Sequence, residues 1–218
     1  MSNLSLPILY SFRRCPYAMR ARMALHYSNI NCILREVDLK NKPSAMLEIS
    51  PKGTVPVLQL PDGRLIEESL EIIYYSLDQN DPEGLNNLSS ETALKARHLI
   101  EKNDMEFVGI LRKYKYFERY PENTQVSYRN QAEELFLIEY EQMLEGQDFL
   151  LGKKSVADIA ILPFIRQFAL ADEEWFFNSK YKNLIKWLNA VIQSEAFEVK
   201  VMAKHQTWKE GDKAIYLL

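Results

Sequence analysis

Residues 8–18 read Ile8-Leu9-Tyr10-Ser11-Phe12-Arg13-Arg14-Cys15-Pro16-Tyr17-Ala18. The apolar run at the start of this stretch predicts a short buried strand. Pro16 suits the first turn of a helix, where its missing N–H costs nothing. Apolar residues then recur at helical spacing, at Ala18, Ala21 and Leu25. The chain is therefore expected to open with a strand, a short loop and a helix, and Cys15 stands at the start of that helix.

Strand and helix signals continue to alternate up to about residue 80. They predict a second strand, a short helix, two further strands and a final helix, over Cys32–Val37, Pro43–Glu48, Val57–Leu60, Arg64–Glu67 and the face formed by Leu70, Ile73, Tyr74 and Leu77. Pro61-Asp62-Gly63 joins the third and fourth strands, and Asp and Gly suit the turn of a hairpin. Helical crossovers combined with one hairpin indicate an α/β domain with a mixed four-stranded sheet.

The composition changes after residue 80. Residues 81–90 are mostly polar and contain Pro82 and Gly84, which predicts a linker between domains. Beyond the linker only helical spacing is evident, and Ser155 with Asp158 forms a Ser-x-x-Asp helix start. We therefore expect an α/β domain over 1–80, a linker over 81–90 and an all-α domain over 91–218.

The composition and charge of the chain limit the classes of protein to which it can belong. The chain is 47% hydrophobic and 26% charged, with a formal net charge of -3, which favours a globular protein and disfavours a general nucleic-acid binder. No apolar run approaches the roughly 18 residues that span a bilayer, and Met1–Leu6 lacks the charged and apolar regions of a secretory signal. We expect a cytoplasmic protein without nucleic-acid or membrane partners.

The histidines and cysteines do not suggest a metal centre or a disulfide framework. The three histidines have no zinc-like spacing, so no metal is expected. Thiols stay reduced in the cytoplasm, which leaves Cys15 and Cys32 free. Cys32 heads a predicted strand without a basic neighbour, so we interpret it as a core residue.

Cys15 is the candidate nucleophile. The unpaired N–H groups and the dipole at a helix start stabilise a thiolate, and cysteines in such places can have pKa values lowered from about 8.5 to roughly 3.5–7.5. Arg13 and Arg14 add positive charge, although an inert buried cysteine is the alternative. Residue 18 is alanine, so the second thiol of a Cys-x-x-Cys pair is missing. A reaction through Cys15 would then need a thiol from solution to complete it.

Several weaker signals suggest a site for an extended ligand with charged ends. Pro56 stands just before a strand, where a cis peptide bond would expose the Val55 backbone, although an ordinary trans bond is the alternative. Ser69 precedes a helix and could bind a carboxylate there, with Glu68 taking an ammonium group, or could simply cap the helix. Lys42 could hold a second carboxylate or be a solvated surface lysine.

In this order the segments resemble the cytosolic glutathione transferases, most closely the cysteine-dependent omega type. The resemblance rests on residues 14–22 (RCPYAMRAR), 38–43 (DLKNKP), 51–58 (PKGTVPVL) and 67–69 (EES). In the second half, Leu151-Gly152 followed by Ser155-Val156-Ala157-Asp158-Ile159 is similar to the family's buried capping motif. The resemblance covers nearly the whole chain and weakens after about Lys204.

The resemblance implies a thioredoxin-like first domain, a helical second domain and a homodimer, with glutathione as cosubstrate. Cys15 would face the glutathione sulfur and Lys42 the glycyl carboxylate. The Val55 backbone would pair with the cysteinyl unit. Glu68 and Ser69 would hold the γ-glutamyl end.

The resemblance and the lone Cys15 together suggest a glutathione-dependent thiol transferase or reductase. Its acceptor would be a small apolar or disulfide-containing molecule, a glutathione mixed disulfide or an oxidised compound such as dehydroascorbate. Two alternatives stay open. One is conjugation of glutathione to electrophiles, with Tyr10 or Ser11 activating the glutathione thiol. The other is a non-catalytic binding or regulatory protein of the same family.

Overall fold

The structure is a computed structural model that describes residues 6–218. The chain forms two compact units. One runs as far as Glu83 and also takes in Ser194–Leu218, and the other comprises Gly84–Gln193. The expected all-α domain over 91–218 is therefore wrong at its C-terminal end, because the last segment packs with the first unit. Residues 1–5, which carry most of the stretch behind the expected lack of a secretory signal, lie outside the described residues.

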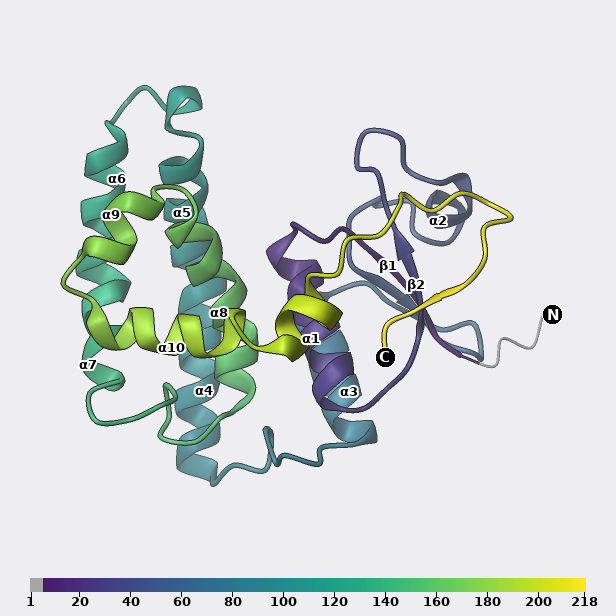
Figure 1. The fold of residues 1–218 in the computed structure, drawn as a ribbon, viewed down its shortest axis with the longest axis horizontal. Helices are drawn as coiled ribbons and strands as arrows, with labels where there is room; N and C mark the ends of the chain where they lie inside the picture. The colour runs from purple at the N-terminus through teal and green to yellow at the C-terminus, as the bar shows by residue number, and fades with distance from the viewer. Residues whose placement is uncertain (1–5) are drawn as a thin grey trace. The chain divides into compact units, whose positions relative to one another are not determined.

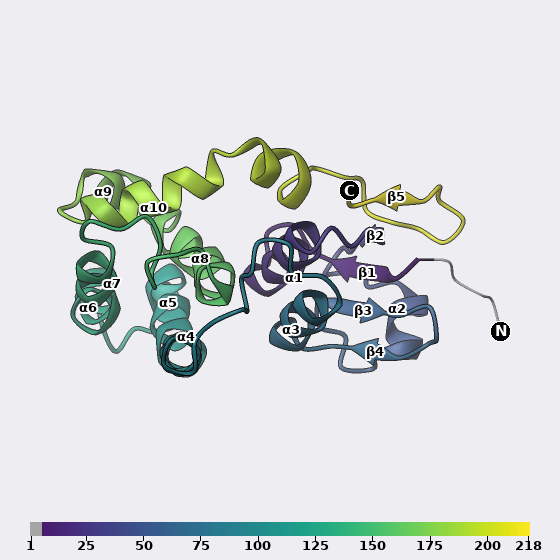
Figure 2. The same ribbon diagram turned by 90° about the horizontal axis from the view of Figure 1, so that it is seen from below.

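The first unit is built on a five-stranded sheet in the order β4-β3-β1-β2-β5 (Figures 1 and 2). The strands are β1 Ile8–Ser11, β2 Ile33–Glu36, β3 Val57–Gln59, β4 Leu65–Ile66 and β5 Ile215–Tyr216. β1 and β2 are parallel, and the other neighbouring pairs are antiparallel. The predicted mixed sheet is confirmed, but the predicted number of four strands is wrong. The extra strand comes from the C-terminal tail, where a two-residue pairing is too short for any alternation to announce it.

Alternating residues of the sheet enter two separate cores. Leu9 of β1 packs with residues of α1 (Pro16–Tyr27) and α3 (Ser69–Gln79), which cover one face. Its neighbours Ile8 and Tyr10 pack on the other face with Met46 of α2 (Ser44–Ile49). Successive strand residues point to opposite faces, so the short apolar run fills both cores at once. The loop between β1 and α1 is thereby anchored from both sides of the sheet.

The C-terminal tail is hydrogen-bonded along β2. The Trp208 N–H donates to the carbonyl of Glu36 at 2.8 Å, and the Arg35 guanidinium lies 4.0 Å from the centre of a Trp208 ring. Further along, the Leu217 N–H donates to the carbonyl of Cys32 at 3.1 Å. These bonds satisfy a strand edge that would otherwise present unpaired backbone groups.

Cys32 lies in the core behind this edge and is fully buried. Burial raises the pKa of its thiol to about 12. The prediction that Cys32 is a core residue is confirmed.

The second unit is helical throughout. A long helical stretch runs through α4 (Ser90–Lys102), a π-helical turn η1 (Asn103–Phe107) and α5 (Val108–Lys115), followed by the single turn η2 (Phe117–Arg119). The remaining elements are α6 Gln125–Ala132, η3 Glu133–Leu137, α7 Ile138–Met143, α8 Val156–Ala169, α9 Glu173–Asn178 and α10 Lys182–Ile192. The predicted helical character of this part of the chain is confirmed.

Ser155 and Asp158 form the predicted cap of α8. The buried Asp158 carboxylate accepts hydrogen bonds from the Ser155 N–H at 2.9 Å, the Leu150 N–H at 3.1 Å and the Trp187 indole N–H at 2.9 Å. Each of these donors would otherwise be buried without a partner. The pair joins α8, α10 and the loop before α8, and its role is structural.

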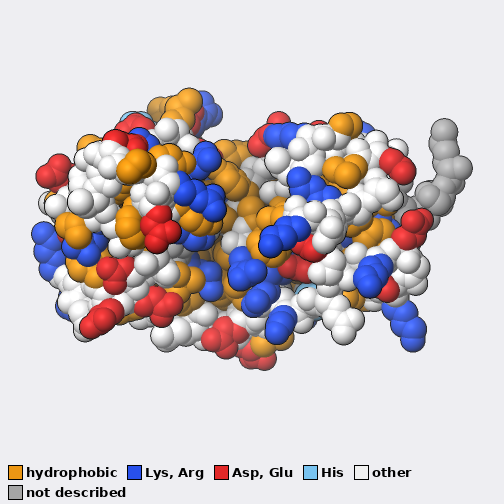
Figure 3. All heavy atoms as spheres, turned by 90° about the horizontal axis from the view of Figure 1, so that it is seen from above, with side chains coloured by type: hydrophobic (Ala, Val, Ile, Leu, Met, Phe, Trp, Pro, Cys, Tyr) orange, Lys and Arg blue, Asp and Glu red, His pale blue; other side chains and the backbone are white. Residues whose placement is uncertain are grey.

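No helix within residues 6–218 is long and apolar enough to cross a bilayer. Figure 3 shows positive and negative side chains interspersed over the face in view. Among the same described residues, no three His, Cys, Asp or Glu side chains are grouped so that they could hold a metal ion.

Candidate functional site

A cavity of about 510 Å³ lies within the first unit. Small-molecule sites typically measure about 300–1,000 Å³. The cavity is lined by Cys15, Tyr17, Leu39, Lys42, Lys52, Gly53, Thr54, Val55, Pro56, Glu67, Glu68 and Ser69. All six residues singled out from the sequence thus border one space, although they come from four separate segments of the chain.

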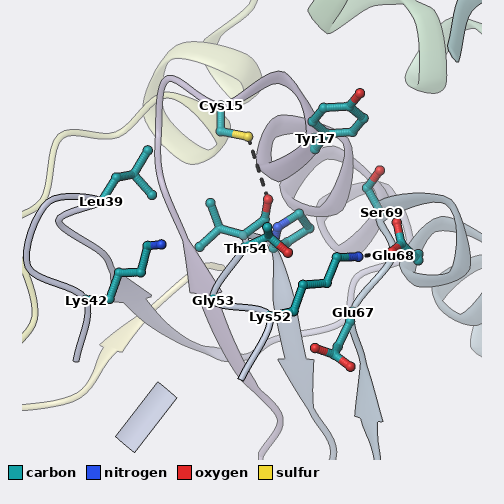
Figure 4. Close-up of a pocket in the computed structure, with 12 residues that line it drawn as sticks. Cys15, Tyr17, Leu39, Lys42, Lys52, Gly53, Thr54, Glu67, Glu68 and Ser69 are labelled. Atoms are coloured by element: carbon teal, nitrogen blue, oxygen red, sulfur yellow. Dashed lines mark hydrogen bonds and ion pairs between the residues drawn. The ribbon is translucent and has the colours of Figure 1, made fainter. Parts of the chain in front are cut away.

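The two ends of the cavity are lined by side chains of different charge (Figure 4). Lys42 and Leu39 stand at one end, and Glu67, Glu68 and Ser69 stand at the other. Cys15 and Tyr17 overhang the middle. The strip from Gly53 to Pro56 forms the wall opposite them, and the Val55–Pro56 peptide bond in this strip is cis. A ligand that fits this space would be extended, with one end near a cation and the other near carboxylates and a helix start.

Cys15 is the residue immediately before α1, and Pro16 begins the helix. Its side chain is half-buried, and its thiol donates to the carbonyl oxygen of Val55 across 3.7 Å (Figure 4). Burial raises the thiol pKa above its ordinary value of 9.0. The backbone N–H groups of Ala18 and Tyr17 oppose this shift without overcoming it. The expected lowering of the pKa is therefore wrong, because desolvation outweighs the helix start.

The cations that favour the Cys15 thiolate come from α1. The charges of Arg20 and Arg22 both act to lower the thiol pKa. Arg13 and Arg14, the pair expected from the sequence to do this, are engaged elsewhere. The Arg14 guanidinium lies 5.4 Å from the Phe12 ring centre, and Arg13 donates to the Met202 carbonyl at 3.4 Å. No local pattern in the sequence indicates that the helix directs its arginines inward.

Arg22 is fully buried and satisfied on all sides. It donates to the Ser11 hydroxyl at 2.8 Å, to the Val201 carbonyl at 3.1 Å and to the Glu36 carboxylate, with which it forms an ion pair. The other oxygen of Glu36 accepts the Arg13 N–H at 2.7 Å. One buried carboxylate therefore ties α1, the end of β2 and the loop before Cys15 together.

Gly53 determines how closely the loop approaches Lys42. Its φ is 61°, a left-handed conformation that glycine adopts without strain. A Cβ at this position would lie 3.1 Å from Leu47 Cδ2 and 3.4 Å from Lys42 Nζ. A side chain here would strain the backbone and crowd the lysine, so the glycine keeps the Lys42 end of the cavity open.

The far end of the cavity is the start of α3. Glu68 is the residue before the helix and its side chain caps nothing, whereas Ser69 is the first helical residue and is buried. Ser69 is therefore not the N-cap that the alternative interpretation required. Its hydroxyl accepts a hydrogen bond from Arg20 at 3.5 Å, and Glu68 forms an exposed ion pair with Lys52 (Figure 4). This end offers a carboxylate, an ammonium and uncapped helix N–H groups to a ligand.

Tyr10 and Ser11, the candidate hydroxyl groups for thiol activation, lie outside this space. Both side chains are buried. The Tyr10 hydroxyl accepts from Arg35, and the Ser11 hydroxyl accepts from Arg22. Neither residue lines the cavity.

Comparisons with known proteins agree with this architecture. Residues 9–84 match the family model "Glutathione S-transferase, N-terminal domain", and residues 131–190 match "Glutathione S-transferase, C-terminal domain". A segment of 75 residues is 43% identical to rat glutathione S-transferase omega-1, covering 34% of this chain and 31% of the rat protein. Over 205 residues the chain is 30% identical to Arabidopsis thaliana glutathione S-transferase L2, chloroplastic, covering 87% of this chain and 64% of that protein.

The solved structure of a glutathione S-transferase from Methylobacillus flagellatus with GSH bound has the same fold. It aligns with a TM-score of 0.73 and 20% identity over 88% of this chain and 97% of the other. The two family models together match more than half of the sequence. The chain belongs to the glutathione S-transferase family, with relatives of the omega class.

Proposed function

We propose that this protein is a glutathione-dependent thiol transferase that forms a mixed disulfide on Cys15. The observation that carries the proposal is the position of the Cys15 thiol. It is the one cysteine side chain among those lining the described cavity, whereas Cys32 is buried in the core. The hydroxyl groups of Tyr10 and Ser11, which the conjugating alternative requires, are buried and engaged. Thiol chemistry at Cys15 is therefore favoured over conjugation.

The cavity suits glutathione from end to end. Lys42 would hold the glycyl carboxylate, and the backbone of Val55 would pair with the cysteinyl unit in the middle. At the far end, Ser69 with the helix start would take the γ-glutamyl carboxylate, and Glu68 would take the ammonium group. Glu68 already forms an exposed ion pair with Lys52. The ammonium group of the ligand would therefore replace Lys52 as the partner of Glu68. Relatives with glutathione bound in their solved structures support this choice of ligand.

In the reaction we propose, the Cys15 thiolate attacks a sulfur of a glutathione mixed disulfide. A new S–S bond to Cys15 forms, the old S–S bond breaks, and the acceptor leaves as a thiolate. A second glutathione then releases Cys15 in the same way, because no second protein thiol is available. The thiol donates a hydrogen bond to the Val55 carbonyl, and only the protonated form of Cys15 can make this bond. A ligand N–H that bonds to this carbonyl competes with the thiol and thus favours the thiolate.

The proposal is tested by measuring thiol transfer from a glutathionylated peptide in Cys15→Ala, with Ser11→Ala as the matched variant at a buried residue. We expect Cys15→Ala to lose the activity and Ser11→Ala to keep most of it. Conjugation to a standard electrophile is measured in parallel. Retained thiol transfer in Cys15→Ala, or conjugation that depends on Ser11 and not on Cys15, would refute the proposal. The small apolar or disulfide-containing acceptor, the homodimer and the cytoplasmic location remain predictions.

A further inference from the structure

A second cavity, of about 440 Å³, lies on the same two loops as the first. It is lined by Phe12, Arg13, Arg14, Glu36, Val37, Asp38, Lys204, His205 and Thr207. We call it the basic cavity. The two cavities share no lining residue, yet Arg14 adjoins Cys15 and Asp38 adjoins Leu39 in the chain. Figure 4 labels Cys15 and Leu39, and the residues that precede them in the chain, Arg14 and Asp38, line the basic cavity.

Positive charge dominates the basic cavity. Within the described part of the chain, the side chains of Arg13, Arg14 and Lys204 form no ion pair with a carboxylate. Glu36 contributes no free negative charge, because the buried Arg22 already neutralises it.

Two further titratable groups line the same space. The Asp38 carboxylate is turned to its own loop, where it accepts bonds from the Lys40 N–H at 2.9 Å and the Asn41 amide at 3.0 Å. Burial and the nearby Arg22 lower the pKa of His205, which leaves that ring neutral at neutral pH. Three cations thus face one carboxylate that is already engaged, and the cavity fits an anionic group.

The proposed thiol-transfer cycle supplies a ligand with that chemistry. Cys32 is buried, so the mixed disulfide on Cys15 has to be released by a thiol from solution. In the proposed cycle this thiol is glutathione, which carries two carboxylates. The thiol of glutathione is on its central residue, and consecutive Cα atoms lie about 3.8 Å apart. A carboxylate one residue away from the sulfur is therefore separated from it on the same scale as Arg14 is from Cys15.

We propose that the basic cavity binds a carboxylate of the resolving glutathione, with Arg14 and Lys204 as its main cations. This inference rests on the proposed function. The incoming thiolate attacks the glutathione sulfur of the mixed disulfide. An S–S bond forms between the two glutathione molecules, the bond to Cys15 breaks, and Cys15 leaves as a thiolate. The thiol proton passes to solvent, and no other oxidant or reductant takes part.

The test separates the two halves of the cycle. Wild type and Arg14→Gln/Lys204→Gln are first loaded on Cys15 with oxidised glutathione, and the excess is removed. Rapid quenching and mass spectrometry then follow release of the adduct at increasing concentrations of glutathione, or of uncharged 2-mercaptoethanol. Lys153→Gln/Lys213→Gln removes two exposed charges elsewhere and serves as the control.

We expect the double variant to need about tenfold more glutathione for half-maximal release, with the 2-mercaptoethanol rate and the control unchanged. An unaltered glutathione dependence would overturn the inference. So would equal slowing by both thiols, since that indicates a displaced loop rather than a lost charge. If wild type takes up no glutathione on Cys15 in the loading step, the proposed function itself fails and this inference falls with it.

Discussion

The carboxylate of Glu36 forms a buried ion pair with the guanidinium of Arg22, directly behind the loop that carries Cys15. The pair ties α1 to β2, because Arg22 is fully buried and Glu36 is its counter-ion. Glu36 is therefore expected to matter for the stability of the first unit.

Replacing Glu36 with Gln should destabilise the protein. Arg22 would keep a hydrogen-bond acceptor but lose its counter-ion, and a buried charge left without a partner costs about 3 kcal/mol. We expect a fall of that size in the free energy of unfolding in urea. Glu91→Gln, which breaks the exposed pair with Lys95, should change it little and serves as the control. Equal stability of the two variants would show that the Arg22 pair is not structurally important.

The raised pKa of Cys15 predicts a shifted pH dependence of thiol alkylation. Only the thiolate reacts, so a pKa above 9.0 means that the alkylation rate of the folded, ligand-free protein continues to rise beyond pH 9. In urea the midpoint should fall to that of an ordinary cysteine. Peptide mass spectrometry distinguishes Cys15 from the buried Cys32. A plateau below pH 8 in the folded protein would contradict the role assigned to burial.

Lys42 should matter for affinity and not for chemistry. In a Cys15→Ser background, Lys42→Gln removes the cation at one end of the cavity, and the dissociation constant of glutathione should rise about fivefold, as expected for about 1 kcal/mol. Lys40→Gln provides a matched control, because Lys40 is exposed and does not line the cavity. Calorimetric titration measures both. If the two variants bind equally well, the Lys42 end of the site is misassigned.

In the helical unit, Asp158→Ala should leave three buried hydrogen-bond donors without an acceptor, on Leu150, Ser155 and Trp187. Each unsatisfied group costs about 1–3 kcal/mol, so a loss of at least about 3 kcal/mol is expected. Thermal unfolding should show a clearly lower Tm. Asp148→Ala removes an exposed carboxylate paired with Lys186 and should leave the Tm nearly unchanged. A small effect of Asp158→Ala would mean that water replaces the carboxylate.

Local patterns predicted the α/β part of the fold because its elements follow one another along the chain. Pro16 marked the start of α1, and Asp62-Gly63 marked the turn between β3 and β4. Cys15, Pro56 and Ser69 could be singled out because each stands next to the start of a helix or strand. Their assignment to one ligand, together with Lys42, came from the family resemblance.

The features that sequence reasoning missed depend on contacts far apart in the chain. β5 pairs with β2 across more than half of the sequence, and nothing near Ile215 announces it. The inward course of Arg20 and Arg22 is set by partners on α3, β1, β2 and the segment at Val201. The prediction that the pKa of Cys15 is lowered was wrong for a related reason. A helix start is visible in sequence, whereas the burial that outweighs it is not.

The most direct test of the central claim is intact-protein and peptide mass spectrometry after incubation with oxidised glutathione, comparing wild type with Cys15→Ser. The proposed function predicts one glutathione adduct on wild type, located on Cys15, and none on the variant. An adduct on Cys32, or equal modification of both proteins, would contradict it.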